Sequence, residues 1–355
     1  MHYKKFQNQV NFLITFLFLF GISSSTFSKD FDDSEIQDIS YPDWFLDDSF
    51  KDLNDDLANA IANGKKGLMI MFTTQGCSYC KMFLKVSLGN PRIADLVQRN
   101  FDTMGLEIFD DTEMTHPDGT PMLVKEFAIK EGAGIAPTLL FFGSNGKKMF
   151  SLVGYKSPEH FENIISFVEN REPNEKFRDY LRRKSINVVE KSDYKLKDDP
   201  FFLPASALSE RQQAEHQQAA PQKPLLVLLE ANNCLECENF HNDVLALPEI
   251  REQLEKFDVV RLDRNDSITS LTTPTGETVT PQQWYTSQEL TQLPTLLFYS
   301  TDNQLILKTD SIVKRQRMLN SMGLVLDKAY EKGWNYQRYA RNKGIERAMK
   351  KQSNQ

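Results

Sequence analysis

The run Leu68-Met69-Ile70-Met71-Phe72 is short, continuous and apolar, and Gly76-Cys77-Ser78-Tyr79-Cys80-Lys81-Met82 follows it closely. Such a run is typical of a strand buried on both faces. The cysteines come where this strand ends and a helix begins, and that helix stops before Asn90-Pro91. A thiol in the first turn of a helix lies near unpaired N–H groups, which favour its thiolate. We therefore expect Cys77 to be a nucleophile and Cys80, one turn later, to resolve the mixed disulfide.

The same pattern recurs further along the chain. Adding 157 to the residue number carries Cys77 onto Cys234 and Cys80 onto Cys237, and it carries Pro137-Thr138-Leu139-Leu140-Phe141 onto Pro294-Thr295-Leu296-Leu297-Phe298. These matches keep one register without a gap from Cys77 to Phe141, which is difficult to obtain by chance, so we infer a tandem duplication of one domain. A second echo pairs two short aromatic motifs and predicts that each unit ends in a similar packed helix: Phe177-x-x-Tyr180 and Tyr336-x-x-Tyr339.

Helices and strands are expected to alternate in both units. In the first unit the patterns predict helices at 49–63, 77–88, 122–129 and 158–170, with strands at 68–72, 102–108, 138–142 and 148–153. In the second unit they predict a helix at 234–245, a possible first helix at 207–219, and strands at 225–229, 259–263, 295–299 and 305–308. We therefore expect an α/β protein of two tandem domains, each with a mixed central sheet flanked by helices.

Length and charge set the broad class. The 355 residues suggest about two domains, and 42 Lys+Arg against 49 Asp+Glu leave a net charge of −7, which argues against a nucleic-acid binder. Lys4 and Lys5 precede a mostly apolar run over 12–22, and Ser/Thr-rich residues follow it. This pattern is typical of a secretory signal peptide, and the run is shorter than the about 20 residues that span a bilayer. We expect secretion across the inner membrane into the periplasm, without stable membrane insertion after cleavage.

The domain organisation follows from these signals. The sequence predicts a signal peptide at 1–28, an acidic, solvated leader at 29–44, a first domain at 45–185, a polar linker at 186–204, and a second domain at 205–355. The second domain includes a basic C-terminal helical extension, which we interpret as a packed helix with a solvated basic face.

These features resemble the thioredoxin-like superfamily, and most closely its secreted SoxW-type proteins. The resemblance covers about residues 45–180 well and 205–340 more loosely, and it rests on several motifs: 76–82 quoted above, Asn90-Pro91-Arg92-Ile93, Asp118-Gly119, Pro137-Thr138-Leu139-Leu140-Phe141-Phe142 and Gly154-Tyr155. It implies a thiol-disulfide oxidoreductase that needs no cofactor or metal. Its partners would be the thiols and disulfides of secreted or periplasmic proteins, with a membrane thiol-electron donor upstream.

The resemblance also implies residues that meet the substrate. In that family the proline before the threonine is cis and lies beside the active sulfurs, which implies this position for Pro137 and Pro294. The preceding residues, Ala136 and Leu293, would offer backbone hydrogen bonds to an extended substrate. Tyr79, between the cysteines, is a further expected substrate contact.

Two differences from the better-known thioredoxins limit which of their properties the resemblance implies for this chain. The Trp-Cys-Gly-Pro-Cys sequence is absent, and Met71 and Leu228 replace the acid that many thioredoxins place six residues before the first cysteine. Proton handling must therefore differ, and no reduction potential can be transferred.

Three other interpretations stay open for the cysteine pairs. The pairs could share a zinc ion as four thiolates, or His241 could join the second pair as a ligand, although an exposed helical histidine is more common. Each pair could also be a structural disulfide, especially in the second unit, where Glu230, Glu236 and Glu238 disfavour a thiolate. A thioredoxin-fold adaptor that is inactive or partly inactive in redox chemistry is the alternative function.

Overall fold

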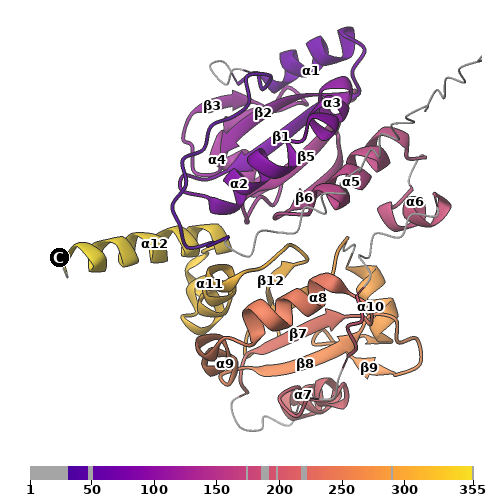
Figure 1. The fold of residues 1–355 in the computed structure, drawn as a ribbon, viewed down its shortest axis with the longest axis vertical. Helices are drawn as coiled ribbons and strands as arrows, with labels where there is room; N and C mark the ends of the chain where they lie inside the picture. Colours follow the sequence, from indigo (N-terminus) through magenta and orange to yellow (C-terminus); the bar gives the residue numbers. More distant parts are fainter. Residues whose placement is uncertain are drawn as a thin grey trace, which may run out of the picture. The chain divides into compact units, whose positions relative to one another are not determined.

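Figure 1 shows the fold in a computed structural model of the chain. The structure describes residues 31–46, 51–172, 175–184, 192–196, 199–216, 222–288 and 291–353. The predicted signal peptide, the predicted start of the first helix at Ser49 and much of the predicted linker lie outside these residues. Residues 32–355 pack as one unit that contains two α/β domains.

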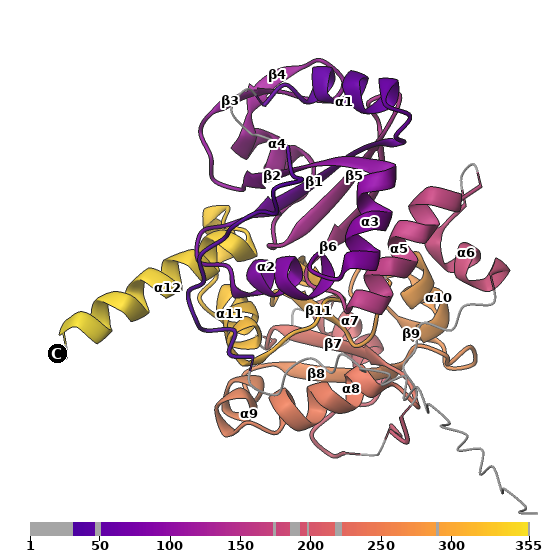
Figure 2. The same cartoon turned by 45° about the horizontal axis from the view of Figure 1, so that its top comes forward.

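The first domain is built on a four-stranded sheet in the order β2-β1-β5-β6. β1 (Gly67–Thr73) is parallel to β2 (Phe101–Glu107) and antiparallel to β5 (Thr138–Gly143), and β5 pairs antiparallel with β6 (Lys148–Val153). Every residue of β1 is buried, as its continuous apolar run predicts, because helices lie on both faces of the sheet (Figures 1 and 2). The remaining elements are α1 (Leu53–Ala62), α2 (Ser78–Met82), a π-helical turn (Phe83–Ser87), α3 (Pro91–Asn100), β3 (Glu113–Thr115), β4 (Pro121–Leu123), α4 (Val124–Lys130), α5 (Pro158–Asn170) and α6 (Phe177–Arg183).

The second domain repeats this sheet, in the order β12-β11-β7-β8. β7 (Leu225–Glu230) is parallel to β8 (Asp258–Asp263) and antiparallel to β11 (Thr295–Tyr299), which pairs with β12 (Leu305–Thr309). The prediction of two α/β domains, each with a mixed sheet flanked by helices, is confirmed. The other elements are α7 (Ser206–His216), α8 (Leu235–Phe240), a π-helical turn (His241–Leu245), α9 (Pro248–Leu254), β9 (Leu271–Thr272), β10 (Thr278–Val279), α10 (Pro281–Ser287), α11 (Arg315–Leu326), a 3-10 turn (Ala329–Lys332) and α12 (Tyr336–Ser353).

Capping side chains decide where several helices begin. The side-chain Oδ1 of Asn90 accepts the N–H of Arg92, and Pro91 occupies the first helical position of α3. α1 begins at Leu53 because Asp52 is its N-cap. The β3–β4 hairpin was not expected, because strands of three residues leave too little alternation to recognise.

The aromatic motifs behave as the repeat predicts. Phe177 and Tyr180 of α6 are buried, and so are Tyr336 and Tyr339 of α12. Burying an aromatic side chain of this size is worth roughly 2 kcal/mol, so these residues anchor both helices. α12 then continues well beyond its counterpart, and its residues from Ile345 to Lys350 are exposed.

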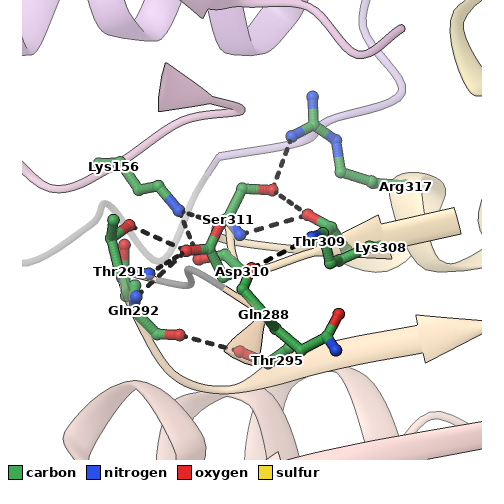
Figure 3. Close-up of polar contacts among 10 residues, drawn as sticks. All are labelled: Lys156, Gln288, Thr291, Gln292, Thr295, Lys308, Thr309, Asp310, Ser311 and Arg317. Atoms are coloured by element: carbon green, nitrogen blue, oxygen red, sulfur yellow. Dashed lines mark hydrogen bonds and ion pairs between the residues drawn. The ribbon is translucent and has the colours of Figure 1, made fainter. Parts of the chain in front are cut away.

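A buried ion pair joins the two domains (Figure 3). Lys156 is 0% exposed, and its Nζ donates to Asp310 Oδ1 at 2.6 Å and to the Asp310 carbonyl oxygen at 2.7 Å. The second carboxylate oxygen accepts the Thr291 N–H, the Thr291 hydroxyl and the Gln292 N–H. Burial by itself would raise the pKa of Asp310, but the charge and hydrogen bond of Lys156, together with the bonds from Thr291, outweigh it and lower that pKa. Both oxygens of this carboxylate therefore accept hydrogen bonds, one from Lys156 and the other from Thr291 and Gln292.

Replacing Asp310 by Asn should lower the free energy of unfolding by about 3 kcal/mol at pH 7, because the lysine stays buried without a counter-charge and an amide NH₂ faces other donors. The pKa of Asp310 is depressed in the folded state, so its stabilising effect is present above the ordinary value of 3.8 and is lost as the pH falls through the folded pKa. Urea unfolding should therefore show the deficit of Asp310→Asn shrinking as the pH falls below 3.8. Asp302→Asn, on the exposed turn before β12, is the matched control. Equal midpoints for the two variants at pH 7 would contradict the expected effect.

Candidate active site

Cys77 and Cys80 form a disulfide at the N-terminus of α2. Cys77 is the N-cap residue, and its Sγ accepts the backbone N–H of Cys80 at 3.1 Å. The first N–H groups of a helix have no partner within the helix and favour negative charge, so this position suits a Cys77 thiolate after reduction. Cys77 is partly exposed, whereas Cys80 is 0% exposed. The accessible sulfur is thus the one expected to attack, and the buried one is the one expected to resolve.

Ala136, the residue before Pro137-Thr138, lines the same pocket as Cys77. The Ala136–Pro137 peptide bond is cis, as is the Leu293–Pro294 bond of the second domain. Cys77 and Ala136 line one pocket of about 330 Å³. The tertiary structure therefore brings together two positions that lie 59 residues apart in the sequence.

Both backbone polar groups of Ala136 already have partners. The Ala136 N–H donates to Gln337 Oε1 at 2.9 Å, and the Ala136 carbonyl oxygen accepts from Arg317 Nη2 at 2.8 Å. Arg317 belongs to α11 and Gln337 to α12, so the second domain supplies both side chains. Neither residue was expected at this site, because no local motif marks them.

Tyr79 lies inside the structure and does not face the solvent. Its side chain is 4% exposed, its hydroxyl donates to Asp33 Oδ2 at 2.9 Å, and it accepts the Lys314 N–H at 2.8 Å. The Arg317 guanidinium lies 3.5 Å from the centroid of the Tyr79 ring, a cation–π contact. Burial, and then the nearby charge of Asp33, raises the pKa of Tyr79 well above its usual value. The side chain expected to meet a substrate therefore contacts the leader and the second domain, and it also lines the pocket that contains Cys77.

The acidic leader is docked at the site and is not simply solvated as predicted. The Asp33 carboxylate accepts the N–H groups of Gln316 and Arg317 at 2.8 Å each, and its carbonyl oxygen accepts the Ser78 hydroxyl. A carboxylate is stabilised at a helix N-terminus, here that of α11, by unpaired N–H groups and the helix dipole. Further along, the Gln37 N–H donates to the carbonyl oxygen of Gly76, directly before Cys77.

The second disulfide is closed to solvent. Cys234 and Cys237 are bonded at the N-terminus of α8, and the Cys234 Sγ accepts the Cys237 N–H at 3.1 Å. Cys234 is 3% exposed and Cys237 is 0% exposed. The same local motif therefore has a buried first sulfur here and a partly exposed one in the first domain.

Residues 192–196 cover this second disulfide. The Asn233 N–H donates to the Tyr194 carbonyl oxygen at 2.8 Å, and the Leu196 N–H donates to Asn232 Oδ1 at 3.0 Å. The Tyr194 ring packs against the apolar cluster that contains both cysteines, and its hydroxyl donates to Glu230 Oε2. Part of the predicted polar linker thus serves as a cover for Cys234.

His241 pairs with a buried carboxylate. Its Nε2 lies 2.9 Å and 3.0 Å from the two carboxylate oxygens of Glu230, whose side chain is completely buried. A buried carboxylate without a donor is costly, so this contact accounts for the position of His241. The interpretation of His241 as an exposed helical residue is wrong for this reason. Within the described residues, no group of three or more His, Cys, Asp or Glu side chains is arranged to hold a metal ion.

Comparison with known proteins decides the family. Residues 53–169 and 211–325 each match the family described as a thioredoxin-like domain, and the two matches together span more than half of the chain. The chain belongs to the thioredoxin-like family. No significant match was found among curated protein sequences. Across the part of the chain that the structure describes, no helix is long and apolar enough to cross a membrane.

Several solved structures are similar to one thioredoxin-like domain of the chain. A thioredoxin-fold protein from Helicobacter pylori is 21% identical, with 39% of this chain and 88% of that chain covered and a TM-score of 0.32. A disulphide isomerase from Xylella fastidiosa Temecula1 is 16% identical, with 38% and 100% covered and a TM-score of 0.28. The C-terminal domain of DsbD from Neisseria meningitidis is 17% identical, with 35% and 99% covered and a TM-score of 0.26.

The two thioredoxin-like domains should differ in how fast their disulfides are reduced. In the native protein a phosphine reductant should open Cys77–Cys80 at least about tenfold faster than Cys234–Cys237, because attack requires access to a sulfur. Timed alkylation followed by peptide mass spectrometry measures both rates in one sample. The same two rates in urea are the control, since unfolding removes the difference in burial. Equal native rates would contradict the closed state of the second disulfide.

Removing the cover should open the second disulfide. Tyr194→Ala takes away a ring that packs against the apolar cluster containing Cys234 and should raise the reduction rate of this pair about tenfold. Tyr194→Phe keeps the ring, loses only the hydroxyl with its hydrogen bonds to Glu230 and Arg261, and should stay close to the wild-type rate. If both variants react like the wild type, residues 192–196 do not limit access to Cys234.

Proposed function

We propose that the chain is a secreted thiol-disulfide oxidoreductase whose working site is Cys77–Cys80. The observation that carries this proposal is the placement of a partly exposed Cys77 at the N-terminus of α2, three residues before a fully buried Cys80. This arrangement favours a reactive thiolate at one sulfur and protects the other until it is needed.

The reaction is a two-step disulfide exchange. The Cys77 thiolate attacks one sulfur of a substrate disulfide, a Cys77–substrate bond forms, and the other substrate sulfur leaves as a thiolate. The Cys80 thiol gives up its proton and attacks the Cys77 sulfur, which closes Cys77–Cys80 and releases the second substrate thiolate. Two electrons pass from the protein to the substrate, and the same steps in reverse oxidise a dithiol. The direction depends on the reduction potential and on the partners.

Secretion and protein partners form part of the same proposal. Its support is the charged and then apolar pattern of the first 28 residues, which is typical of a signal peptide. The periplasm would provide client proteins with thiols and disulfides, and a membrane thiol-electron donor would keep Cys77–Cys80 reduced. The kinship with SoxW-type proteins and the origin by tandem duplication belong to this proposal too, and the shift of 157 residues that carries Cys77 onto Cys234 supports the duplication.

The second domain is better suited to an accessory role than to an electron relay. Both of its cysteines are buried and residues 192–196 lie against the turn that precedes them, so an incoming thiolate would have to displace part of the protein to reach Cys234. A protected disulfide stabilises a domain mainly by restricting its unfolded chain. This observation favours a domain that is inactive in redox chemistry and docks against a partner, which is the adaptor function applied to one half of the chain.

Cysteine variants test the proposed site. Cys77→Ser should abolish exchange with oxidised glutathione, measured as coupled oxidation of the reduced protein, because the attacking sulfur is gone. Cys80→Ala should instead accumulate a mixed disulfide with glutathione, visible as an added mass, because nothing resolves it.

The double variant Cys234→Ala/Cys237→Ala is the matched control for these variants. It should keep the wild-type exchange rate within about twofold, while its thermal midpoint falls, since loss of a disulfide that closes a short loop costs at most about 2–3 kcal/mol. Full activity in Cys77→Ser would overturn the assignment of the nucleophile. Loss of activity in the double variant would contradict the accessory role and would show that the second domain takes part in electron transfer.

A further inference from the structure

The second domain completes the active site of the first. Arg317 and Gln337 are both buried, and between them they engage the carbonyl oxygen and the N–H of Ala136. The backbone N–H of Gln337 also donates to the Gly134 carbonyl oxygen at 3.0 Å. The start of α12 therefore lies along the loop that leads to Pro137 much as an added chain would.

An extended polypeptide needs these same groups. When a strand adds to an edge, a paired residue exchanges both its N–H and its carbonyl oxygen with the incoming chain. At Ala136 both groups already have hydrogen-bond partners, and the partner of the carbonyl oxygen is the charged guanidinium of Arg317. Hydrogen bonds to charged groups are stronger than those between neutral groups. A client that binds by strand addition must first displace Arg317 and Gln337.

The contacts that hold Arg317 in place are extensive. Asp33 accepts its backbone N–H, the Tyr79 ring lies 3.5 Å from its guanidinium, and its Nη1 donates to the Ser311 hydroxyl at 3.4 Å (Figure 3). The buried pair of Lys156 and Asp310 fixes the segment between β12 and α11 to the first domain. The Arg317 side chain is therefore not a loose surface group that a client could push aside freely.

Cys77 nevertheless lines a pocket. The pocket of about 330 Å³ beside it is lined by Gly76, Cys77 and Ala136 of the first domain and by Arg317, Gln337 and Ile345 of the second. Pockets of this size accept small molecules. A compact disulfide can thus approach the Cys77 sulfur without pairing with Ala136.

We propose that α11 and α12 select disulfides by size, with Arg317 and Gln337 as the residues that determine this specificity. Low-molecular-weight disulfides react with Cys77 in the arrangement described, whereas extended polypeptide disulfides react only after the two side chains leave Ala136. The proposal rests on the proposed function of Cys77 as the nucleophile.

The test compares two substrates in one protein. Initial rates of exchange are measured with oxidised glutathione and with insulin, and the insulin-to-glutathione ratio is the readout. In Arg317→Met/Gln337→Met, which keeps the side-chain bulk but removes the groups that bind Ala136, the ratio should rise about tenfold or more, the factor that one charge-assisted hydrogen bond is worth. Arg315→Met is the matched control: it lies in the same turn of α11, pairs with Glu249 and should leave both rates unchanged.

The outcomes separate this proposal from the proposed function. If the ratio stays at the wild-type value while Cys77→Ser abolishes both reactions, size selection is wrong and the oxidoreductase stands. If glutathione exchange persists in Cys77→Ser, the proposed function itself fails. Should near-ultraviolet circular dichroism show that the double variant is misfolded, Gln337→Met alone decides: a rise of about threefold supports the proposal, and no rise overturns it.

Discussion

Burial of β1 on both faces is the constraint on which the active site depends. All residues of β1 are buried, so helices must cover both faces of the sheet. The chain leaves the sheet at the end of β1 and enters one of these helices, α2. Cys77 stands at this junction as the N-cap of α2, where the unpaired N–H groups favour a thiolate. The position of the sulfur is therefore a consequence of how the core is packed, and the second domain places Cys234 by the same route.

Accessibility is decided separately from this placement. Residues 192–196 close over Cys234, whereas the docked leader reaches Gly76 and leaves Cys77 partly exposed. Arg317 then links three parts of the molecule, since its backbone meets Asp33, its guanidinium meets the ring of Tyr79, and one of its N–H groups meets the carbonyl oxygen of Ala136. A guanidinium suits this role because its donors point in fixed directions and its flat face stacks on aromatic rings. The two domains share one fold and one motif, and the segments that lie against them make one site open and the other closed.

Short-range signals accounted for much of what was predicted. The strand at 68–72, the helix at 158–170 and the start of α2 at the cysteines depend on neighbouring residues, so the sequence alone reveals them. The prediction for His241 was wrong, because its partner Glu230 is on another element and helical spacing does not show what a helix faces. The burial of Tyr79 was not foreseen for the same kind of reason. Its neighbours in the motif say nothing of Asp33 and Arg317, which bury it.

The sequence by itself determined an α/β chain of two similar domains and the positions of the two cysteine pairs at the starts of two helices. These follow from periodicity, capping and spacing, which act over a few residues. Only the tertiary structure decided which disulfide stays accessible and what meets Ala136. Gln337 and Arg317 lie 201 and 181 residues away from Ala136 in the chain. A single hydrogen bond closed over such a distance leaves no periodic or local trace in the sequence, because it depends on how two finished domains pack.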